Sequence, residues 1–373
     1  MPTKHTNSEV AVKNSVRPVL LIDKDIVSDG ASSLHHLMVG LNDDSCHTAL
    51  VCPVGVETDS LVCPAVEVIR YPLFKTPLLR SQNIKALLGS VAKFKPTILH
   101  CCGNSMARLT RYLSCRLDVP YVLTFDSVRR RPFAPCVSSD HCGALIASSQ
   151  VIAEHIKHSH RRLAERVIRI NIGEFVEDVC ACFPDTARVT SMVVAQTLDN
   201  PSDFEPLLNA VKHLAVDGCE FVLVIAGTGP AERKLHEMIK ALGLSQIVTT
   251  VGNIRPVRTV FAGADIFIVP RPSRRFNPRL LEAMSVGMAV AACRGGVDDL
   301  LIEDKTAVLF DPEDELGIYS SLQKLLDKRE FARRIANAAQ SHIREHHSVS
   351  KMIELLIKTY RTAQAWYKNS GND

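Results

Sequence analysis

The sequence predicts an α/β protein of two Rossmann-like, doubly wound domains that face a cleft, with closing helices at the C-terminus. Three observations predict this fold class. Short apolar segments alternate with amphipathic helical segments, which is typical of βαβ units and of a parallel sheet covered on both faces. The alternation occurs in two series, one on each side of a polar segment that contains Pro184. The length of 373 residues also exceeds the ~100–200 residues of one ordinary domain.

The first series is predicted to form an N-terminal domain over residues 18–186, after a disordered polar tail over residues 1–17. It begins with a strand rich in leucine and β-branched residues, a polar turn at Ser28-Asp29-Gly30, and a helix whose apolar residues recur every three or four positions. Further strands are predicted at 47–54, 66–73, 96–102, 120–126 and 143–149, with helices at 83–94 and 106–117. This order indicates a Rossmann-like fold.

The second series is predicted to form a C-terminal domain over residues 187–345. The segment 181–189 is the best linker candidate, because it carries Pro184 and polar residues. Strands are predicted at 190–196, 220–227, 247–253, 264–270, 288–293 and 306–310, with a helix at 204–215. Residues 346–373 are predicted to form closing helices that cross back to the N-terminal domain. Ligands of open parallel sheets bind beyond the carboxyl ends of the strands, so we expect the site in the cleft between the domains.

Composition excludes several classes of protein. The chain has 44 Lys and Arg against 40 Asp and Glu, a formal net charge of +4, and this weak balance predicts no nucleic-acid partner. No apolar stretch approaches the ~20 residues that cross a bilayer, and the N-terminus lacks the apolar middle of a signal peptide. We therefore expect a cytoplasmic protein. Its twelve cysteines are scattered, many inside apolar runs, and are expected to be reduced, buried thiols.

Two segments carry the strongest chemical signals. A buried-type strand runs directly into Gly227-Thr228-Gly229-Pro230 and a helix, where backbone amides and the helix start could hold a phosphate. The same glycines also suit a tight strand-to-helix turn without a ligand. Further along, Glu282 lies near the start of a helix, where it could accept hydrogen bonds from a sugar hydroxyl or simply stabilise the helix. No CxxC or HExxH spacing occurs, so no metal site is predicted.

The order of these segments resembles family 4 retaining glycosyltransferases, which have the GT-B fold. Similarity to their C-terminal domain rests on GTGP, VGN, ADIFIVP, LLEAMSVG and RGGVDD, and similarity to their N-terminal domain on SDGASSLHHLMVGL, FKPTILHCCG and DHCGALIASSQVI. The resemblance implies transfer of a sugar from a nucleotide-sugar donor to a saccharide, lipid-linked or other acceptor, with retention of configuration. It implies no required cofactor and no obligatory metal. The donor is expected on the C-terminal domain and the acceptor on the N-terminal one.

Carried over by position, the resemblance implies a set of site residues. The catalytic positions fall on Asp126, Arg274 and Glu282. The donor-binding positions fall on Gly30, Thr197, Ser202, Gly227, Gly229, Arg275, Leu281 and Glu282.

Several of these positions depart from the family pattern. The arginine and lysine that grip the donor diphosphate in the family fall on Thr197 and Ser202, so both charges are missing. The family's paired glutamates fall on Arg274 and Glu282, and a histidine of the N-terminal domain falls on Asp126. Features that determine the fold therefore persist better than the charged groups of the donor site.

Two basic segments are candidates for binding anions. Because an arginine fork suits phosphate oxygens, one hypothesis is that Arg274 or Arg275 supplies the charge lost at Thr197 and Ser202, and the alternative is a solvated basic loop. Arg129, Arg130 and Arg131 could contact an anionic acceptor or an anionic membrane surface, which would place the protein peripherally at the inner face of the membrane. The alternative is again a solvated loop.

The sequence therefore leaves two functional interpretations. The first is an active glycosyltransferase with an altered grip on its donor, supported by Glu282, the glycine turns and the arginine cluster. The second is a catalytically inactive GT-B-like protein that binds a sugar, a nucleotide or a partner as an accessory subunit. The missing cations at Thr197 and Ser202 favour the second, because each lost donor to a developing anion typically costs ~10²–10³ in rate. The retained Glu282, the glycine turns and the arginine cluster outweigh this loss, so the prediction is an active glycosyltransferase, with the inactive protein as the alternative.

Overall fold

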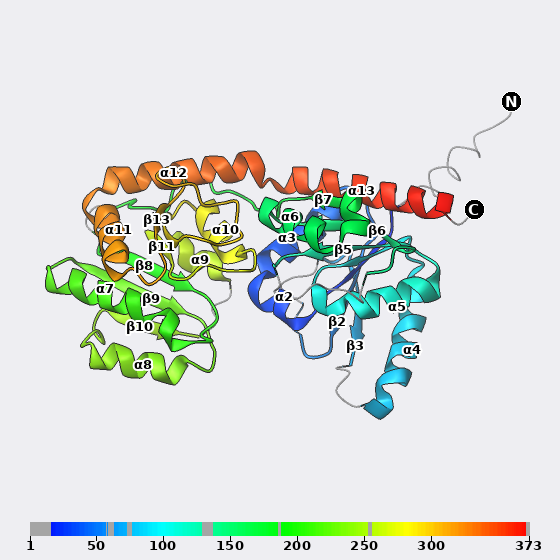
Figure 1. Ribbon diagram of the computed structural model, residues 1–373, viewed down its shortest axis with the longest axis horizontal. Helices are drawn as coiled ribbons and strands as arrows, with labels where there is room; N and C mark the ends of the chain where they lie inside the picture. Colours follow the sequence, from blue (N-terminus) through cyan, green and yellow to red (C-terminus); the bar gives the residue numbers. More distant parts are fainter. Residues whose placement is uncertain are drawn as a thin grey trace. The chain divides into compact units, whose positions relative to one another are not determined.

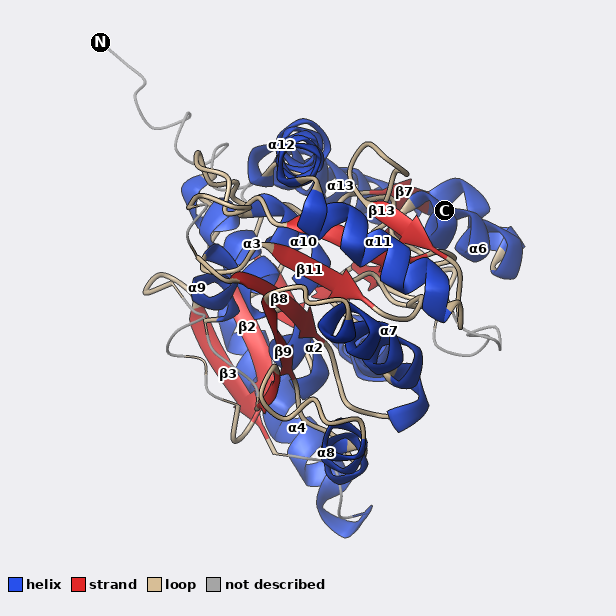
Figure 2. Ribbon diagram, turned by 90° about the vertical axis from the view of Figure 1, so that its left-hand side faces the viewer, coloured by secondary structure: helices blue, strands red, loops and turns tan. Residues whose placement is uncertain are grey.

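The computed structural model describes residues 16–56, 58, 63–72, 77–128, 137–185, 188–252 and 256–370 (Figure 1). The chain divides into two units. Unit 1 comprises the described residues up to Gly173 together with those from Val349 onward, and unit 2 runs from Glu174 to Ser348. Each unit is an α/β structure around a parallel sheet, as the sequence predicts. Helices pack against the strands in each unit (Figure 2).

In its described residues, unit 1 has a seven-stranded parallel sheet of order β3-β2-β1-β4-β5-β6-β7. The strands are β1 Pro18–Leu21, β2 Ala49–Pro53, β3 Glu67–Tyr71, β4 Ile98–Cys101, β5 Tyr121–Phe125, β6 Cys142–Ala147 and β7 Val167–Arg169. The helices are α2 Lys24–Asp29, α3 Ala31–Asp43, α4 Pro77–Phe94, α5 Ala107–Leu117, α6 Gln150–Ser159 and α13 Val349–Ser370. All residues of β1, β2 and β4 are buried, as expected for parallel strands covered on both faces.

The last helix, α13, belongs to unit 1 although it ends the chain, and it packs on α3 and β6 (red in Figure 1). Two glycines make room for it. A Cβ on Gly143 would lie 2.4 Å from Cβ of Ala363, and a Cβ on Gly40 would lie 2.4 Å from Cγ1 of Ile353. Inside this contact the fully buried Tyr360 hydroxyl lies 2.6 Å from Nδ1 of His100.

In its described residues, unit 2 has a six-stranded parallel sheet of order β10-β9-β8-β11-β12-β13. The strands are β8 Thr190–Ala195, β9 Phe221–Ala226, β10 Val248–Val251, β11 Ile266–Val269, β12 Ala289–Cys293 and β13 Val308–Phe310. The helices are α7 Glu205–Val216, α8 Glu232–Ala241, α9 Val257–Ala262, α10 Pro278–Ser285, α11 Glu315–Asp327 and α12 Arg329–His346, and a 3-10 turn, η3, spans Pro201–Asp203.

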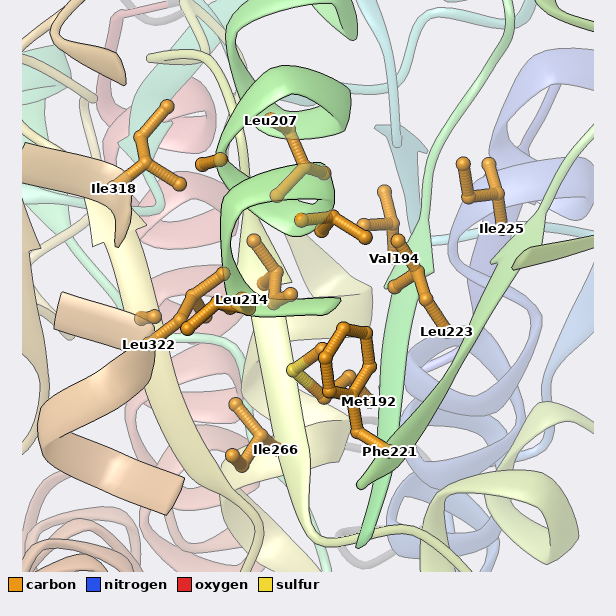
Figure 3. Packing of buried hydrophobic residues seen from close by; sticks show 14 of the residues in the cluster. Met192, Val194, Leu207, Leu214, Phe221, Leu223, Ile225, Ile266, Ile318 and Leu322 are labelled. Atoms are coloured by element: carbon orange, nitrogen blue, oxygen red, sulfur yellow. The ribbon is translucent and has the colours of Figure 1, made fainter. Parts of the chain in front are cut away.

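The core of unit 2 lies between its sheet and the helices α7 and α11. Met192 and Leu223 project from neighbouring strands toward Leu214 of α7 and Leu322 of α11 (Figure 3). All four side chains are fully buried. Since burial of a leucine-sized side chain contributes about 1.5–3 kcal/mol, this cluster fixes the sheet that carries the candidate site.

The predicted linker is part of this core. Ala181, Cys182 and Phe183 are buried, and their main-chain N–H groups donate to Val286 O, Gly287 O and Asp265 Oδ1 at 3.0, 2.9 and 2.8 Å. The chain therefore passes between the units at Gly173–Glu174, before the predicted boundary at 186, and again at Ser348–Val349. Pro184 marks a bend in a packed segment.

Other local expectations differ from the structure. The predicted turn at 28–30 is largely helical, because Asp23 Oδ1 accepts the Ile26 N–H at 3.0 Å and starts α2. The short strand β7 was not predicted from its three residues. Of the predicted tail, residues 1–15 lie outside the described residues, while Val16 is buried and the Arg17 N–H donates to Thr97 Oγ1 at 2.8 Å.

Within the described residues, none of the helices is both long and apolar enough to cross a bilayer.

Candidate functional site

The candidate site of unit 2 lies where the strand order reverses. The chain runs outward from β8 through β9 to β10 on one side, and from β11 through β12 to β13 on the other. In such sheets the crevice at the carboxyl ends of the two central strands is the usual ligand site. Thr197 and Ser202 follow β8, while Arg271, Arg274 and Arg275 follow β11, so the sheet brings the two predicted segments to one edge.

Gly227 and Gly229, after β9, lie so close to the main chain after β8 that a side chain at either position would clash with it. A Cβ on Gly227 would lie 1.9 Å from Gln196 O, and a Cβ on Gly229 would lie 2.3 Å from Leu198 O. The Leu198 N–H donates to Thr228 O at 3.1 Å, and Leu198 O accepts the Ala231 N–H at 2.9 Å. Packing alone therefore explains both glycines. It also holds the turn before α8 against the loop that contains Thr197.

The arginine that reaches this loop is Arg271. Its Nη2 donates to the main-chain oxygen of Ser202 at 3.2 Å, and its guanidinium forms ion pairs with Glu313 at 3.1 Å and Asp203 at 3.7 Å. The Thr197 hydroxyl donates to Asp199 at 2.7 Å. A cation therefore lies beside Ser202, one of the two predicted donor-binding positions without a charge, and it comes from the loop after another strand.

Arg274 and Arg275, the predicted replacements, are both exposed. The main-chain N–H of Arg275 donates to Ser273 Oγ at 3.0 Å. The side chain of Arg274 has no hydrogen bond or ion pair to the part of the chain that the structure describes. Both residues lie on the same loop as Arg271, after β11, but it is Arg271 whose guanidinium contacts Ser202.

The start of α10 positions Glu282. Asn277 precedes the helix, and its Oδ1 accepts the N–H groups of Arg279 and Leu280 at 3.1 and 3.2 Å, with Pro278 at the first helical position. The Asn277 N–H in turn donates to Asp298 Oδ1 at 2.8 Å. Burial raises the pKa of Asp298 to about 7, against the lowering effect of this hydrogen bond.

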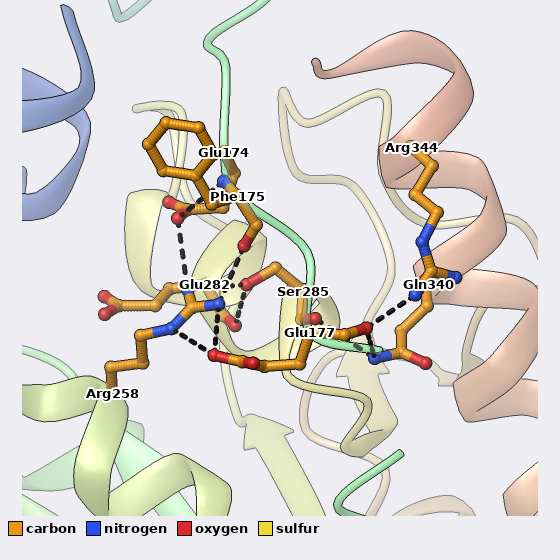
Figure 4. A network of polar contacts seen from close by, with 8 residues as sticks. All are labelled: Glu174, Phe175, Glu177, Arg258, Glu282, Ser285, Gln340 and Arg344. Atoms are coloured by element: carbon orange, nitrogen blue, oxygen red, sulfur yellow. Dashed lines mark hydrogen bonds and ion pairs between the residues drawn. The ribbon is translucent and has the colours of Figure 1, made fainter. Parts of the chain in front are cut away.

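Two predicted donor-site residues on α10 are buried. Leu281 is fully buried, so only its main chain could contact a ligand, and its N–H already donates to Asn277 O at 3.2 Å. Glu282 is 5% exposed. In Figure 4 its carboxylate points away from Ser285 and Gln340.

A carboxyl group beside Glu282 was not predicted from the sequence. Glu174 is buried, and its Oε1 lies 3.2 Å from Nη1 of Arg258 on α9. Burial and the charge of Glu282 raise the pKa of Glu174 to about 8, although Arg258 lowers it. Arg258 also bonds Phe175 O at 2.8 Å and Glu177 at 2.9 Å (Figure 4). No local motif marks Glu174, because its partners lie far along the chain.

In unit 1 the strand order reverses between β1 and β4. Gly30 lies between α2 and α3, and its N–H donates to Ile26 O at 2.9 Å. The tight approach in this region is at Gly103, where a Cβ would lie 2.8 Å from Cδ1 of Ile26. Asp126 follows β5, beside β4 in the sheet, and is half-buried. Asp126 therefore lies at the carboxyl edge of this sheet, while Gly30 joins the two helices that follow β1.

The buried His100 of unit 1 is structural. Its two ring nitrogens lie 2.6 Å from the Tyr360 hydroxyl and 2.7 Å from Thr124 Oγ1, and burial lowers its pKa to about 3. Arg129, Arg130 and Arg131 lie outside the described residues. Across the described ranges, no group of three or more His, Cys, Asp or Glu residues is arranged to hold a metal ion.

The sequence of most of unit 2 matches a known protein family. Residues 190–328 match the family model described as glycosyl transferases group 1. The sulfoquinovosyl transferase of Arabidopsis thaliana is 28% identical over 339 residues, which cover 83% of this chain and 63% of that protein. This chain therefore spans less than two thirds of that relative's length.

Solved structures match both units. A glycosyltransferase from Rickettsia africae has a TM-score of 0.74 at 15% identity, with 94% of this chain and 99% of that chain covered. The Anabaena protein HepE, in complex with UDP and glucose, also has a TM-score of 0.74 at 15% identity, with 92% and 99% covered. The predicted GT-B fold is confirmed by these matches.

Proposed function

We propose that this chain is a glycosyltransferase of GT-B fold, like the group 1 family whose model matches residues 190–328, and that it transfers a sugar from a nucleotide-sugar donor to an acceptor with retention of configuration. The proposal rests on one contact at the carboxyl edge of the sheet of unit 2. There Arg271 donates a hydrogen bond to Ser202 O, on the same edge as the turn at Gly227–Gly229. A cation and a helix start at one edge are features that stabilise a leaving diphosphate. The complex of HepE with UDP and glucose supports a nucleotide as the donor's leaving group.

Arg271 and Glu282 would contact different parts of the donor. Arg271 would hold the diphosphate, exchanging its contact with Glu313, whose side chain is 75% exposed, for phosphate oxygens. Glu282 would accept hydrogen bonds from ribose hydroxyls. Charge that develops on the leaving phosphate is then met by groups already in position, and this preorganisation is the main source of rate enhancement in such sites.

Unit 1 would bind the acceptor, with Asp126 at the carboxyl edge of its sheet. A saccharide or lipid-linked acceptor fits this proposal. Because the charge on the leaving group is met by arginine and backbone donors, we propose that the reaction requires no cofactor and no obligatory metal. Activity that survives a chelator would support this part of the proposal, and activity lost to the chelator and restored by Mg²⁺ would contradict it.

The test is turnover of donors in the absence of an acceptor. Nucleotide sugars based on UDP, GDP and ADP are incubated with the protein, and the released sugar is followed by proton NMR, which distinguishes its two anomers before they equilibrate. The proposal predicts slow release of a sugar with the anomeric configuration of the donor. Release of the opposite anomer contradicts retention. Binding of a donor without any turnover favours the accessory-subunit interpretation instead.

A further inference from the structure

One long stretch of unit 1 contains basic residues but no acidic ones. From Val68 to Leu117 there is no Asp or Glu, although about five would be expected from the 40 among 373 residues. The same stretch carries nine basic residues, which are Arg70, Lys75, Arg80, Lys85, Lys93, Lys95, Arg108, Arg111 and Arg116. Solvated surfaces usually mix charges of both signs, so a run of one sign is a candidate for binding a partner of the opposite sign.

This run belongs to the basic one of the two units. Unit 1 has 25 Lys and Arg against 16 Asp and Glu, a formal charge of +9, whereas unit 2 has 19 against 24, a formal charge of −5. The net charge of +4 therefore combines two units of opposite sign. An anionic partner of this protein would be attracted by unit 1 and repelled by unit 2.

Most of the run lies on two neighbouring helices, α4 and α5, which contact each other. They follow β3 and β4, so both crossovers run across the sheet in the same direction and lie on one face of it. The crossover with α3, from β1 to β2, runs the opposite way, so α3 and the helix α13 packed on it cover the other face (Figure 1).

The basic side chains of these two helices are exposed, whereas the apolar residues that hold the helices on the sheet, such as Leu87 and Leu113, are buried. Among the helices that the structure describes, α4 and α5 are the two that carry more than one Lys or Arg and no Asp or Glu. We define the α4–α5 surface by five exposed cations, which are Lys85, Lys93 and Lys95 on and directly after α4, and Arg108 and Arg116 on α5.

Helix α8 of unit 2 shows how a solvated helix of the same chain differs. Its Arg233 and Lys234 form ion pairs with Glu237 of the same helix, at 3.8 and 3.5 Å. In contrast, the side chains of Lys85 and Arg108 have no hydrogen bond or ion pair to any residue that the structure describes. Their charges are therefore available to a partner.

Apolar side chains between these cations favour a lipid surface over a nucleic acid as the partner. Ile84 and Leu88 of α4 and Leu109 of α5 are partly exposed. The guanidinium of Arg116 lies 5.6 Å from the centroid of the Tyr112 ring, one helical turn before it. Such a mixture suits the headgroup region of a bilayer, where apolar atoms leave water while the charged ends of Lys and Arg meet lipid phosphates.

We propose that the α4–α5 surface binds an anionic lipid bilayer. The inference goes beyond sugar transfer and does not depend on the donor site proposed in unit 2. Each basic residue close to an anionic membrane raises the partition coefficient roughly fivefold. Salt weakens such binding, because the Debye length falls from about 8 Å at physiological ionic strength to about 3 Å at 1 M.

The experiment is flotation of the full chain with vesicles of phosphatidylcholine, and with vesicles of phosphatidylcholine and phosphatidylglycerol in equal amounts. The test variant combines Lys85→Gln, Lys93→Gln and Arg108→Gln. The matched control removes the same charge from exposed residues of α13, on the other face, by Lys351→Gln, Lys358→Gln and Arg361→Gln. We expect the wild type to bind only the anionic vesicles, the test variant to bind them roughly 100-fold more weakly, and the control to bind as the wild type does.

Equal losses in the two triple variants would show that total charge decides, and would overturn the inference. A wild type that binds neither kind of vesicle, or that binds a DNA duplex but no vesicle, would overturn it too. All of these substitutions change exposed side chains, so each variant should melt as the wild type does. If the test variant does not fold, Lys95→Gln combined with Arg116→Gln decides, and it should weaken binding roughly 25-fold. Nucleotide calorimetry on the same samples reports on the donor site separately, so failure of one proposal is distinguishable from failure of the other.

Discussion

Arg271 donates a hydrogen bond to the main-chain oxygen of Ser202 at 3.2 Å, although 69 residues separate the two. Ser202 is the position on which the resemblance places a lysine, and this contact brings a positive charge to that position from another strand. The charge is balanced by Asp203 and by the exposed Glu313 in the absence of a ligand. An incoming diphosphate would compete with Glu313 for the same guanidinium.

Replacing Arg271 should weaken nucleotide binding. A hydrogen bond to a charged group contributes about 1.5–3 kcal/mol, so we expect Arg271→Gln to lower the affinity for a nucleoside diphosphate by roughly 10- to 100-fold. Calorimetry with the nucleotide that binds the wild type is the measurement. Arg334→Gln, a change at an exposed arginine of α12, is the control and should bind as the wild type does. Equal affinities of the two variants would contradict the role of Arg271.

Removing the competing carboxylate should have the opposite effect. Glu313→Gln frees Arg271 from an exposed ion pair, and such pairs contribute about 0.2–1 kcal/mol. We expect nucleotide affinity to rise by up to about fivefold, most clearly at low salt, where exposed charges are least screened. A titration series in increasing NaCl measures this. Weaker binding in Glu313→Gln would show that the carboxylate supports the site.

The glycine at 229 should be essential for stability. An alanine there would place Cβ 2.3 Å from Leu198 O, a backbone atom that cannot move aside cheaply. Overpacking of this kind costs about 1–3 kcal/mol, so thermal denaturation of Gly229→Ala should show a clear fall in melting temperature. Gly89→Ala is the matched control, because its Cβ meets nothing within 4 Å inside α4, and it should stabilise the protein. A Gly229→Ala protein as stable as the wild type would refute the packing argument.

The seat of α13 on unit 1 should depend on Gly143. Gly143→Ala brings its Cβ to 2.4 Å from Cβ and 2.9 Å from Cα of Ala363, so we expect α13 to lift from β6 and the melting temperature to fall. Adding Ala363→Gly removes the closer contact but introduces a glycine into a helix, which costs ~1 kcal/mol. We expect the relief of the contact to exceed this cost, so part of the lost stability should return. Hydrogen exchange of the α13 amides reports the loosening. If the second change only destabilises further, the contact is not the cause.

Stability at neutral pH should depend on Asp298. Because burial holds the folded pKa of Asp298 near 7, above the ordinary ~3.9, its stabilising contribution is fully present below pH 4 and is lost as the pH rises through about 7. Asp298→Asn keeps the acceptor for the Asn277 N–H and removes the titration. We expect its melting temperature to fall less than that of the wild type between pH 4 and pH 8. Parallel curves would contradict this origin of the pH dependence.

Local patterns were sufficient to predict most of the fold. All strands of both sheets except β7, and the helix of Glu282, follow from runs of apolar residues and from their spacing, which are properties of neighbouring positions. The linker was predicted at 181–189 because Pro184 and its polar neighbours resemble a linker locally, but the chain passes between the units at Gly173–Glu174. The burial of Cys182 and Phe183 depends instead on contacts with Gly287 and Asp265, a hundred or so positions away in the sequence.

The site was less predictable for the same reason. The sequence located the arginine cluster after the fourth strand of unit 2, but only the backbone decides that Arg271, rather than Arg274 or Arg275, reaches Ser202. Glu174 carries no motif, since its environment is created by Arg258 and Glu282 from two different helices. The roles of Gly227 and Gly229 needed the position of the neighbouring backbone.

Binding of nucleoside diphosphates to the wild-type protein tests the central claim most directly. UDP, GDP and ADP are titrated separately by calorimetry at pH 7 and low salt, with Arg271→Gln measured beside the wild type. We expect at least one of the three to bind the wild type, and the same nucleotide to bind Arg271→Gln at least about tenfold more weakly. Absence of binding by all three nucleotides would contradict a donor site in unit 2.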